Sequence, residues 1–230
     1  MSLLSLLLSG ALALIVLAGQ AGAQVALAVS PTKKSYREGE PIFLDCTFRN
    51  STDEEKTVSF GDFGTELVKF KSAQAHENIY YRFAVDGFSC RDPITIPPRE
   101  TAHQILPLNQ WCFFKTGKHM IESSFVLEGK TLKKEFTIVV LPPNSKALAA
   151  SVQELFRWYG SLDALDSSTR SEISLGMSLA ATQFPNFAEE VRMAPFETLK
   201  KTGKSHLVGS ILGNVKQWKS VERTSPLGER

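Results

Sequence analysis

Two hydrophobic periods divide this chain, and the change between them limits what it can fold into. From Val25 to Leu141 apolar side chains recur at every second position, as they do in half-buried strands. After Pro142 they recur at every third or fourth position, as on one face of a helix. Consecutive prolines end a strand and open a linker, so a β half should give way to an α half at Pro142-Pro143.

Seven or eight short strands are expected in the β half. In the segment 41–48, one face carries Ile42, Leu44, Cys46 and Phe48. The other expected strands are 25–29, 58–60, 66–70, 79–85, 101–108, 119–127 and 133–141. Strands of this length, separated by turn residues, indicate an antiparallel β-sandwich.

Four helices are expected in the α half, with apolar stripes that start at Leu148, Ile173, Phe187 and Leu207. Thr169 and Glu172 fit a capping box at the start of the second helix. The stripes repeat after about 39 and about 34 residues, as in helical hairpin repeats. The expected organisation is mainly β plus α: a sandwich over 24–141, a linker over 142–145, helical hairpins over 146–220 and a disordered tail over 221–230.

The first thirty residues carry no charged side chain. An apolar run from Leu3 to Leu17 precedes Ala21-Gly22-Ala23, the small residues of a cleavage site. This is the layout of a secretory signal peptide over residues 1–23. The alternative is an uncleaved membrane anchor. Either interpretation places the rest of the chain outside the cytoplasm, secreted or periplasmic, and a membrane is expected as a partner only if the segment is not cleaved.

Several chemistries find no support in the motifs. The net charge of +2 gives no footprint of nucleic-acid binding. The pairs Gly117-Lys118 and Gly203-Lys204 lack the other glycine of a phosphate-binding loop, and the four histidines are scattered. No G-x-S-x-G nucleophile elbow is present. We therefore expect no cofactor, no metal and no enzyme activity; a hydrolase whose residues converge only in space is the open alternative.

The three cysteines, Cys46, Cys90 and Cys112, lie in the part that export would expose to oxidation. Joining Cys90 to Cys112 closes a loop of about 23 residues, which stabilises by about 3 kcal/mol in the chain-entropy model. Cys46 would then be a buried thiol. Its pairing with Cys90 or Cys112 is the alternative.

Three aromatic residues, Trp111, Phe113 and Phe114, surround Cys112 in an inter-strand segment. They either cap the open end of the sandwich or form a rigid loop that anchors a ligand, since sandwich-end loops are where such folds recognise partners. Asn50 opens the sequon Asn50-Ser51-Thr52, a glycosylation site if the host is a eukaryote.

The segment Gly117-Lys118-His119-Met120-Ile121 carries a resemblance. Immunoglobulin domains have Gly/Ala-x-Tyr-x-Cys there, the tyrosine corner followed by a core cysteine. His119 stands at the tyrosine position and Ile121 at the cysteine position, while Cys46 matches the other core cysteine. The β half therefore resembles the immunoglobulin-like superfamily in architecture, without its inter-sheet disulfide. The α half is loosely similar to HEAT-type repeats.

These features predict an exported, non-catalytic binding protein that contacts another protein, or a cell surface, through a sandwich-end loop. The alternative is an inhibitor or accessory subunit of an exported enzyme. Neither resemblance identifies the partner, because such folds host many functions.

Overall fold

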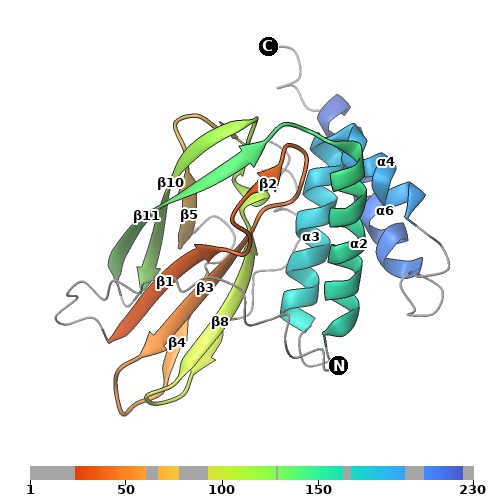
Figure 1. Ribbon diagram of the computed structural model, residues 1–230. Coiled ribbons are helices and arrows are strands. Elements are labelled where there is room, and N and C mark those ends of the chain that lie inside the picture. The colour runs from red at the N-terminus through yellow and green to blue at the C-terminus, as the bar shows by residue number, and fades with distance from the viewer. Residues whose placement is uncertain are drawn as a thin grey trace, which may run out of the picture.

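The computed structural model describes residues 24–60, 67–77, 93–127, 129–162, 167–194 and 205–224. Within them the chain is α+β, with strands in the first part and four helices in the second (Figure 1). The predicted change of secondary structure after Leu141 is confirmed, since the first helix begins at Ser145. The predicted signal peptide, the expected strand 79–85 and Cys90 lie outside the described residues.

Two sheets make up most of the β half. Sheet A has the strand order β1 (Val25–Pro31), β3 (Phe43–Asn50), β8 (Thr101–Pro107). Sheet B has the order β2 (Tyr36–Arg37), β11 (Lys130–Leu141), β10 (Gly117–Leu127), β5 (Val68–Lys71). Neighbouring strands in both sheets are antiparallel, except that β2 runs parallel to β11. Two short ladders join β4 (Lys56–Val58) to β7 (Ile94–Ile96) and β6 (His76–Glu77) to β9 (Cys112–Phe113).

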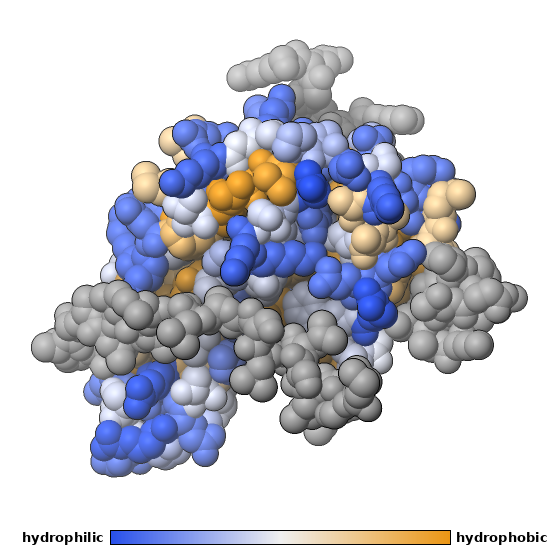
Figure 2. Space-filling view, in the orientation of Figure 1, coloured by the Kyte–Doolittle hydropathy of each residue, from blue (hydrophilic) through white to orange (hydrophobic). Residues whose placement is uncertain are grey.

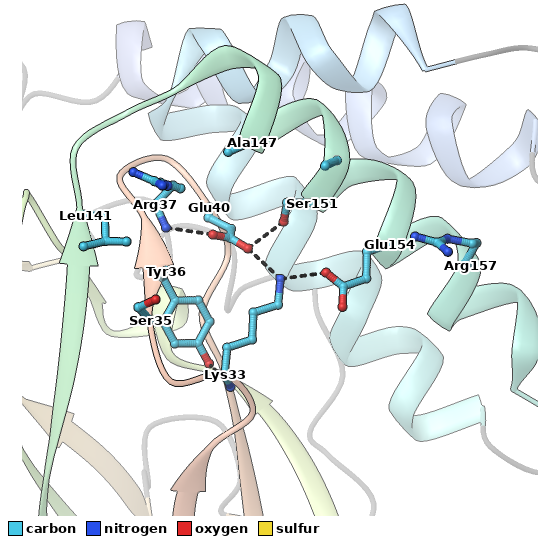
Figure 3. A pocket seen from close by; sticks show the side chains of 11 residues that line it. Lys33, Ser35, Tyr36, Arg37, Glu40, Leu141, Ala147, Ser151, Glu154 and Arg157 are labelled. Carbon is cyan, nitrogen blue, oxygen red and sulfur yellow. Dashed lines mark hydrogen bonds and ion pairs between the residues drawn. The ribbon is translucent and has the colours of Figure 1, made fainter. Parts of the chain in front are cut away.

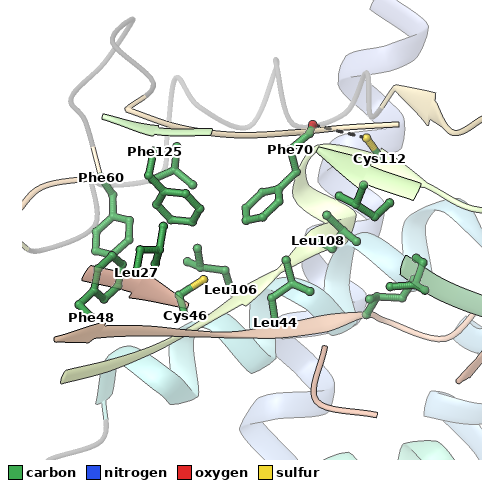
Figure 4. Close-up of a cluster of buried hydrophobic side chains, with 14 of the residues drawn as sticks. Leu27, Leu44, Cys46, Phe48, Phe60, Phe70, Leu106, Leu108, Cys112 and Phe125 are labelled. Carbon is green, nitrogen blue, oxygen red and sulfur yellow. Dashed lines mark hydrogen bonds between the residues drawn. The ribbon is translucent and has the colours of Figure 1, made fainter. Parts of the chain in front are cut away.

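The inner faces of the two sheets share one hydrophobic core. The predicted inner face of β3 is confirmed, because Leu44, Cys46 and Phe48 are fully buried. Phe48 of sheet A meets Phe125 of sheet B edge to face, with ring centroids 6.1 Å apart, and Figure 4 shows these rings between the sheets. Aromatic pairs in this geometry add to the free energy of simple burial.

All four predicted helices are present: α2 (Ser145–Ser161), α3 (Ser167–Gln183), α4 (Pro185–Met193) and α6 (Ser205–Thr224). Asn144 caps α2, since its Oδ1 accepts a hydrogen bond from the backbone N–H of Ala147 at 2.9 Å. The predicted capping box is wrong: α3 begins two residues before Thr169, with Ser171 Oγ already bonded back to the carbonyl of Ser167. Pro185 is the first residue of α4, where its missing N–H costs no hydrogen bond.

The helices cover one end of the outer face of sheet A (Figure 1). Phe43 points outward from β3 into the helical layer and meets Trp158 edge to face at 5.5 Å. At Gly176 of α3 an added Cβ would lie 2.7 Å from the Phe43 ring, so only glycine allows this approach. The similarity to HEAT-type repeats gains no support: α2 packs chiefly on α4, and α3 on α6.

Candidate functional site

A solvent-open groove lies where the end of β11, the segment 33–41 and helix α2 meet (Figure 3). Its volume is about 370 Å³. One side is formed by the segment that links β1 to β3, and the other by the face of α2 that carries Ala147, Ser151 and Glu154. The chain folds this way locally because Gly39, with φ of +97°, makes the tight turn between β2 and β3.

Glu40 is the buried acid of this groove, only 6% exposed. Its Oε1 accepts hydrogen bonds from Lys33 Nζ and Ser151 Oγ, both at 2.7 Å. Its Oε2 accepts one from the backbone N–H of Arg37, also at 2.7 Å. A buried carboxylate is stable only when it is paired and hydrogen-bonded, and Glu40 is both. Through Ser151 it ties the β2–β3 turn to α2.

Lys33 bridges two carboxylates, with Nζ 2.7 Å from Glu40 and 3.1 Å from Glu154 of α2. Burial would lower its pKa, but the charge and hydrogen bonds of Glu40 and Glu154 outweigh burial, and the pKa is raised above its usual 10.5. The amine therefore stays protonated. The hydroxyl of Ser151 donates to Glu40 rather than to this amine.

Tyr36 fixes the same segment to β3 of sheet A. Its hydroxyl donates to the carbonyl of Phe43 at 3.0 Å and accepts from the backbone N–H of Lys33 at 3.1 Å. Burial raises the pKa of this phenol above 10.0 against the opposing effect of the Thr32 hydrogen bond. The phenol is thus a structural donor that holds the groove in shape.

Two arginines stand at the rim of the groove. Arg37 donates from Nη1 to the carbonyl of Pro142 at 3.3 Å, just before α2 begins. Arg157 lies near the other end of α2. Among the described residues neither guanidinium forms an ion pair. Figure 2 shows that this face is mostly hydrophilic, with a small hydrophobic patch at the end of β11, where the half-buried Leu141 lines the groove.

The aromatic residues predicted as a binding loop lie mostly in the core. Phe113 and Phe114 are each 3% exposed; Phe113 packs on Phe184 at 5.7 Å and Phe114 on His119 at 5.1 Å. Trp111 is half-buried, 4.8 Å from Phe70. Both phenylalanines are therefore packed inside the protein rather than projecting from it. Their burial agrees with the capping alternative.

His119 is a buried ring that bonds to the backbone just upstream of it. The ring is 5% exposed, and its Nε2 lies 2.7 Å from the carbonyl of Lys115, four residues upstream. A tyrosine corner makes the same kind of bond back to the preceding backbone. Ile121 and Cys46, at the positions of the family's cysteines, are both fully buried in the core.

The cysteine prediction is tested only in part. Cys46 and Cys112 are buried and are not bonded to each other. The Sγ of Cys112 lies 3.7 Å from the carbonyl oxygen of Phe70. Because Cys90 lies outside the described residues, the Cys90–Cys112 bridge stays a prediction.

Asn50, the first residue of the predicted sequon, has a structural role in this fold. The side chain is fully buried. Its Nδ2 donates to the carbonyls of Glu54, Ile96 and Pro97 at 2.7 to 3.2 Å, and its Oδ1 accepts two bonds from Thr52. A glycan on Nδ2 would displace these bonds and could not fit in the interior.

A second histidine, His103, makes polar contacts on sheet A away from the groove. His103 Nδ1 lies 3.2 Å from both Asp45 Oδ1 and Thr47 Oγ1 on the open end of the outer face of sheet A, where the His103 side chain is 61% exposed. Within the described ranges no three His, Cys, Asp or Glu residues gather around one point that could hold a metal ion. In the same ranges no helix combines the length and apolarity needed to cross a bilayer.

The sequence analysis singled out none of the polar residues of the groove. The contact that buries Glu40 comes from Ser151, 111 positions later. A weak signal was available: the 33–40 segment has five charged residues together with Ser35 and Gly39, immediately before an apolar strand. Such a pattern is also typical of a solvated loop, and only the packing of α2 distinguishes the two.

Comparison with known proteins assigns no family. No family model matches the chain, and no curated protein matches it. Among solved structures it is similar to a FixG-related protein from Vibrio parahaemolyticus (10% identity, 52% of this chain and 98% of that chain, TM-score 0.33). It is also similar to the sporulation control protein Spo0M from Bacillus subtilis (12% identity, 58% and 56%, TM-score 0.34). A third similarity is to the fragment of alpha-2-macroglobulin from Escherichia coli that runs from domain MG7 to the C-terminus (11% identity, 85% and 42%, TM-score 0.34). These likenesses are too distant to indicate a function.

Proposed function

We propose that this chain is an exported, non-catalytic binding protein, and that the groove between the segment 33–41 and α2 receives part of another protein. The uncharged first thirty residues with their small-residue cleavage site support export. The groove lies near the aromatic segment from which recognition was expected, since Thr116, two residues after Phe114, donates two hydrogen bonds to Glu38 of the neighbouring turn.

The scaffold of this binding protein is an immunoglobulin-like sandwich in our proposal. Strands β1, β3 and β8 correspond to strands A, B and E of that fold, and β11, β10 and β5 to strands G, F and C. The parallel strand β2 corresponds to the part of strand A that crosses to the other sheet. The corner bond of His119 supports the same assignment.

The observation that carries the proposal is the hydrogen bonding among the polar groups at the centre of the groove. Its central acid, ammonium and hydroxyl satisfy one another: Glu40 holds Lys33 and Ser151 at 2.7 Å each. Groups bonded in this way give a fixed shape, while the charges that remain available for contact, on Arg37 and Arg157, lie at the rim. A rigid polar centre with arginines around it is suited to recognition, because Arg is enriched among residues that dominate protein interfaces.

Affinity capture from the extracytoplasmic fraction of the host, followed by binding of the purified partner, tests this. We expect wild-type protein to bind the purified partner and the double variant Arg37→Gln, Arg157→Gln to bind at least tenfold more weakly. Arg192→Gln is the matched control, since Arg192 is an exposed helical arginine away from the groove. Equal binding by the double variant would show that the groove is not the site. If the partner is an exported enzyme, its activity in the complex distinguishes an inhibitor from an accessory subunit.

A further inference from the structure

The two rim arginines are separated along the groove rather than clustered. Arg37 contacts the backbone just before α2 starts, beside Ala147 in the first turn. Arg157 follows Ala147 by ten positions on the same helix, which is about 15 Å at a rise of about 1.5 Å per residue. The groove is therefore elongated, with one arginine near each end.

The wall between the arginines is built mostly from small groups. Ala147 and Ala150 offer little side-chain volume, and Leu141 supplies the apolar contact. Lys33 pairs with both Glu40 and Glu154, so with Arg37 and Arg157 three cations face two carboxylates in the groove lining. An extended chain advances about 3.3 Å per residue, so about four to five residues span the same length as this stretch of α2.

We propose that this groove binds an extended acidic segment of the partner protein, with one carboxylate at Arg37 and a second at Arg157. The inference rests on the proposed function and specifies the chemistry of its ligand. Arginine binds carboxylates in a bidentate manner, which fixes both distance and orientation. The amino end of α2, at the Arg37 end, adds the positive end of a helix dipole to the same attraction.

The test is a titration with the C-terminally amidated peptide Asp-Ala-Leu-Ala-Asp, which carries a neutral fluorophore on its amino terminus, followed by anisotropy at low ionic strength. Its two side-chain carboxylates and its central leucine lie on one face of an extended chain. The control is the amidated, identically labelled peptide Asn-Ala-Leu-Ala-Asn, which has the same shape without these two charges. We expect the acidic peptide to bind at least tenfold more tightly than the amide peptide, because hydrogen bonds to charged groups are the stronger ones.

The variants Arg37→Gln and Arg157→Gln should each lower the affinity for the acidic peptide several-fold, and Arg192→Gln should leave it unchanged. The unfolding curve of Arg157→Gln should overlay that of the wild type, since this side chain is exposed. Arg37→Gln also loses the hydrogen bond to the Pro142 carbonyl, so its peptide affinity is measured at a temperature where its unfolding curve shows it fully folded. Equal affinity for the two peptides, or an affinity that neither arginine affects, would overturn the acidic preference. If no peptide binds while the captured partner still depends on the two arginines, protein binding stands and the short acidic ligand is wrong. If the peptide binds but no protein is captured, the proposed function fails instead.

Discussion

Two segments that both lie near Phe184 carry opposite chemistry. The sequence favoured the first as a binding site, whereas the groove lies beside the second. The aromatic segment 111–114 is the most conspicuous stretch of the chain, and its two phenylalanines are buried in the core. The charged segment 33–40 resembles an ordinary solvated turn, yet it contains a buried glutamate and one side of the groove.

The difference follows from how each residue type gains free energy. A phenylalanine in an inter-strand segment is stabilised by any apolar surface within reach, and here Phe184 and His119 provide that surface. A glutamate is buried only when several donors converge on it, and Lys33, Arg37 and Ser151 do so for Glu40. Aromatic clusters are therefore weak evidence for a site, and a buried charged cluster is the better indicator.

The largest expected effect on stability comes from a substitution in the aromatic segment. Phe114→Ala should lower the free energy of unfolding by about 3–5 kcal/mol, because it leaves a cavity in a packed region. Urea unfolding measures this. Met120→Ala is the control, since Met120 is 64% exposed and its loss should change stability little. A normal unfolding curve for Phe114→Ala, combined with lost partner binding, would restore the anchor interpretation.

The next largest effect on stability comes from a substitution in the charged segment. Glu40→Gln should cost about 3 kcal/mol, since it leaves the Lys33 ammonium partly buried without its nearest carboxylate. Glu122→Gln is the matched control: Glu122 also pairs with a lysine, Lys133, but its side chain is 47% exposed. Urea unfolding of both variants tests the difference. Similar stability for the two would mean that the Glu40 cluster is no more than a surface ion pair.

An intermediate loss of stability is expected when the contact between sheet A and helix α3 is disturbed. Gly176→Ala places a methyl group against the Phe43 ring, and overpacking of this kind costs about 1–3 kcal/mol. Gly213→Ala on α6 is the control: an added Cβ there meets nothing within 4 Å, and alanine favours a helix more than glycine does. Measured by thermal unfolding, the Tm of Gly176→Ala should be lower than that of the wild type, and the Tm of Gly213→Ala should not. A stabilised Gly176→Ala protein would contradict the close approach of α3 to sheet A.

The smallest effect is a pH dependence on the alkaline side. The pKa values of Lys33 and Tyr36 are both raised in the folded state, so their contributions to stability are complete below the unfolded values near 10 and are lost as the pH rises through the folded ones. The free energy of unfolding, measured by urea from pH 8 to pH 11.5, should fall at the upper end. Tyr36→Phe should show a shallower fall, because only the Lys33 contribution remains. An equally steep fall in that variant would exclude Tyr36 as a contributor.

The sequence predicted the strands and helices because their apolar periods are local and strong. The inner face of β3 and the helix that carries Phe187 are examples. It did not predict the covering of Phe43 by α3, since that depends on Gly176, which gives no signal in a helical pattern. Asn50 shows the same limit. A sequon is defined by three letters, whereas burial depends on carbonyls from a loop more than forty positions away.

The most direct test of the account places a photoreactive residue at Ala150 in the groove and, in a second protein, at the exposed Lys115 beside the aromatic segment. Both proteins are irradiated with the purified partner, and the cross-linked products are identified by mass spectrometry. The account predicts that Ala150 becomes joined to the partner, through an acidic stretch of it, and that Lys115 does not. Cross-linking from Lys115 alone would return recognition to the aromatic end and contradict the groove as the site.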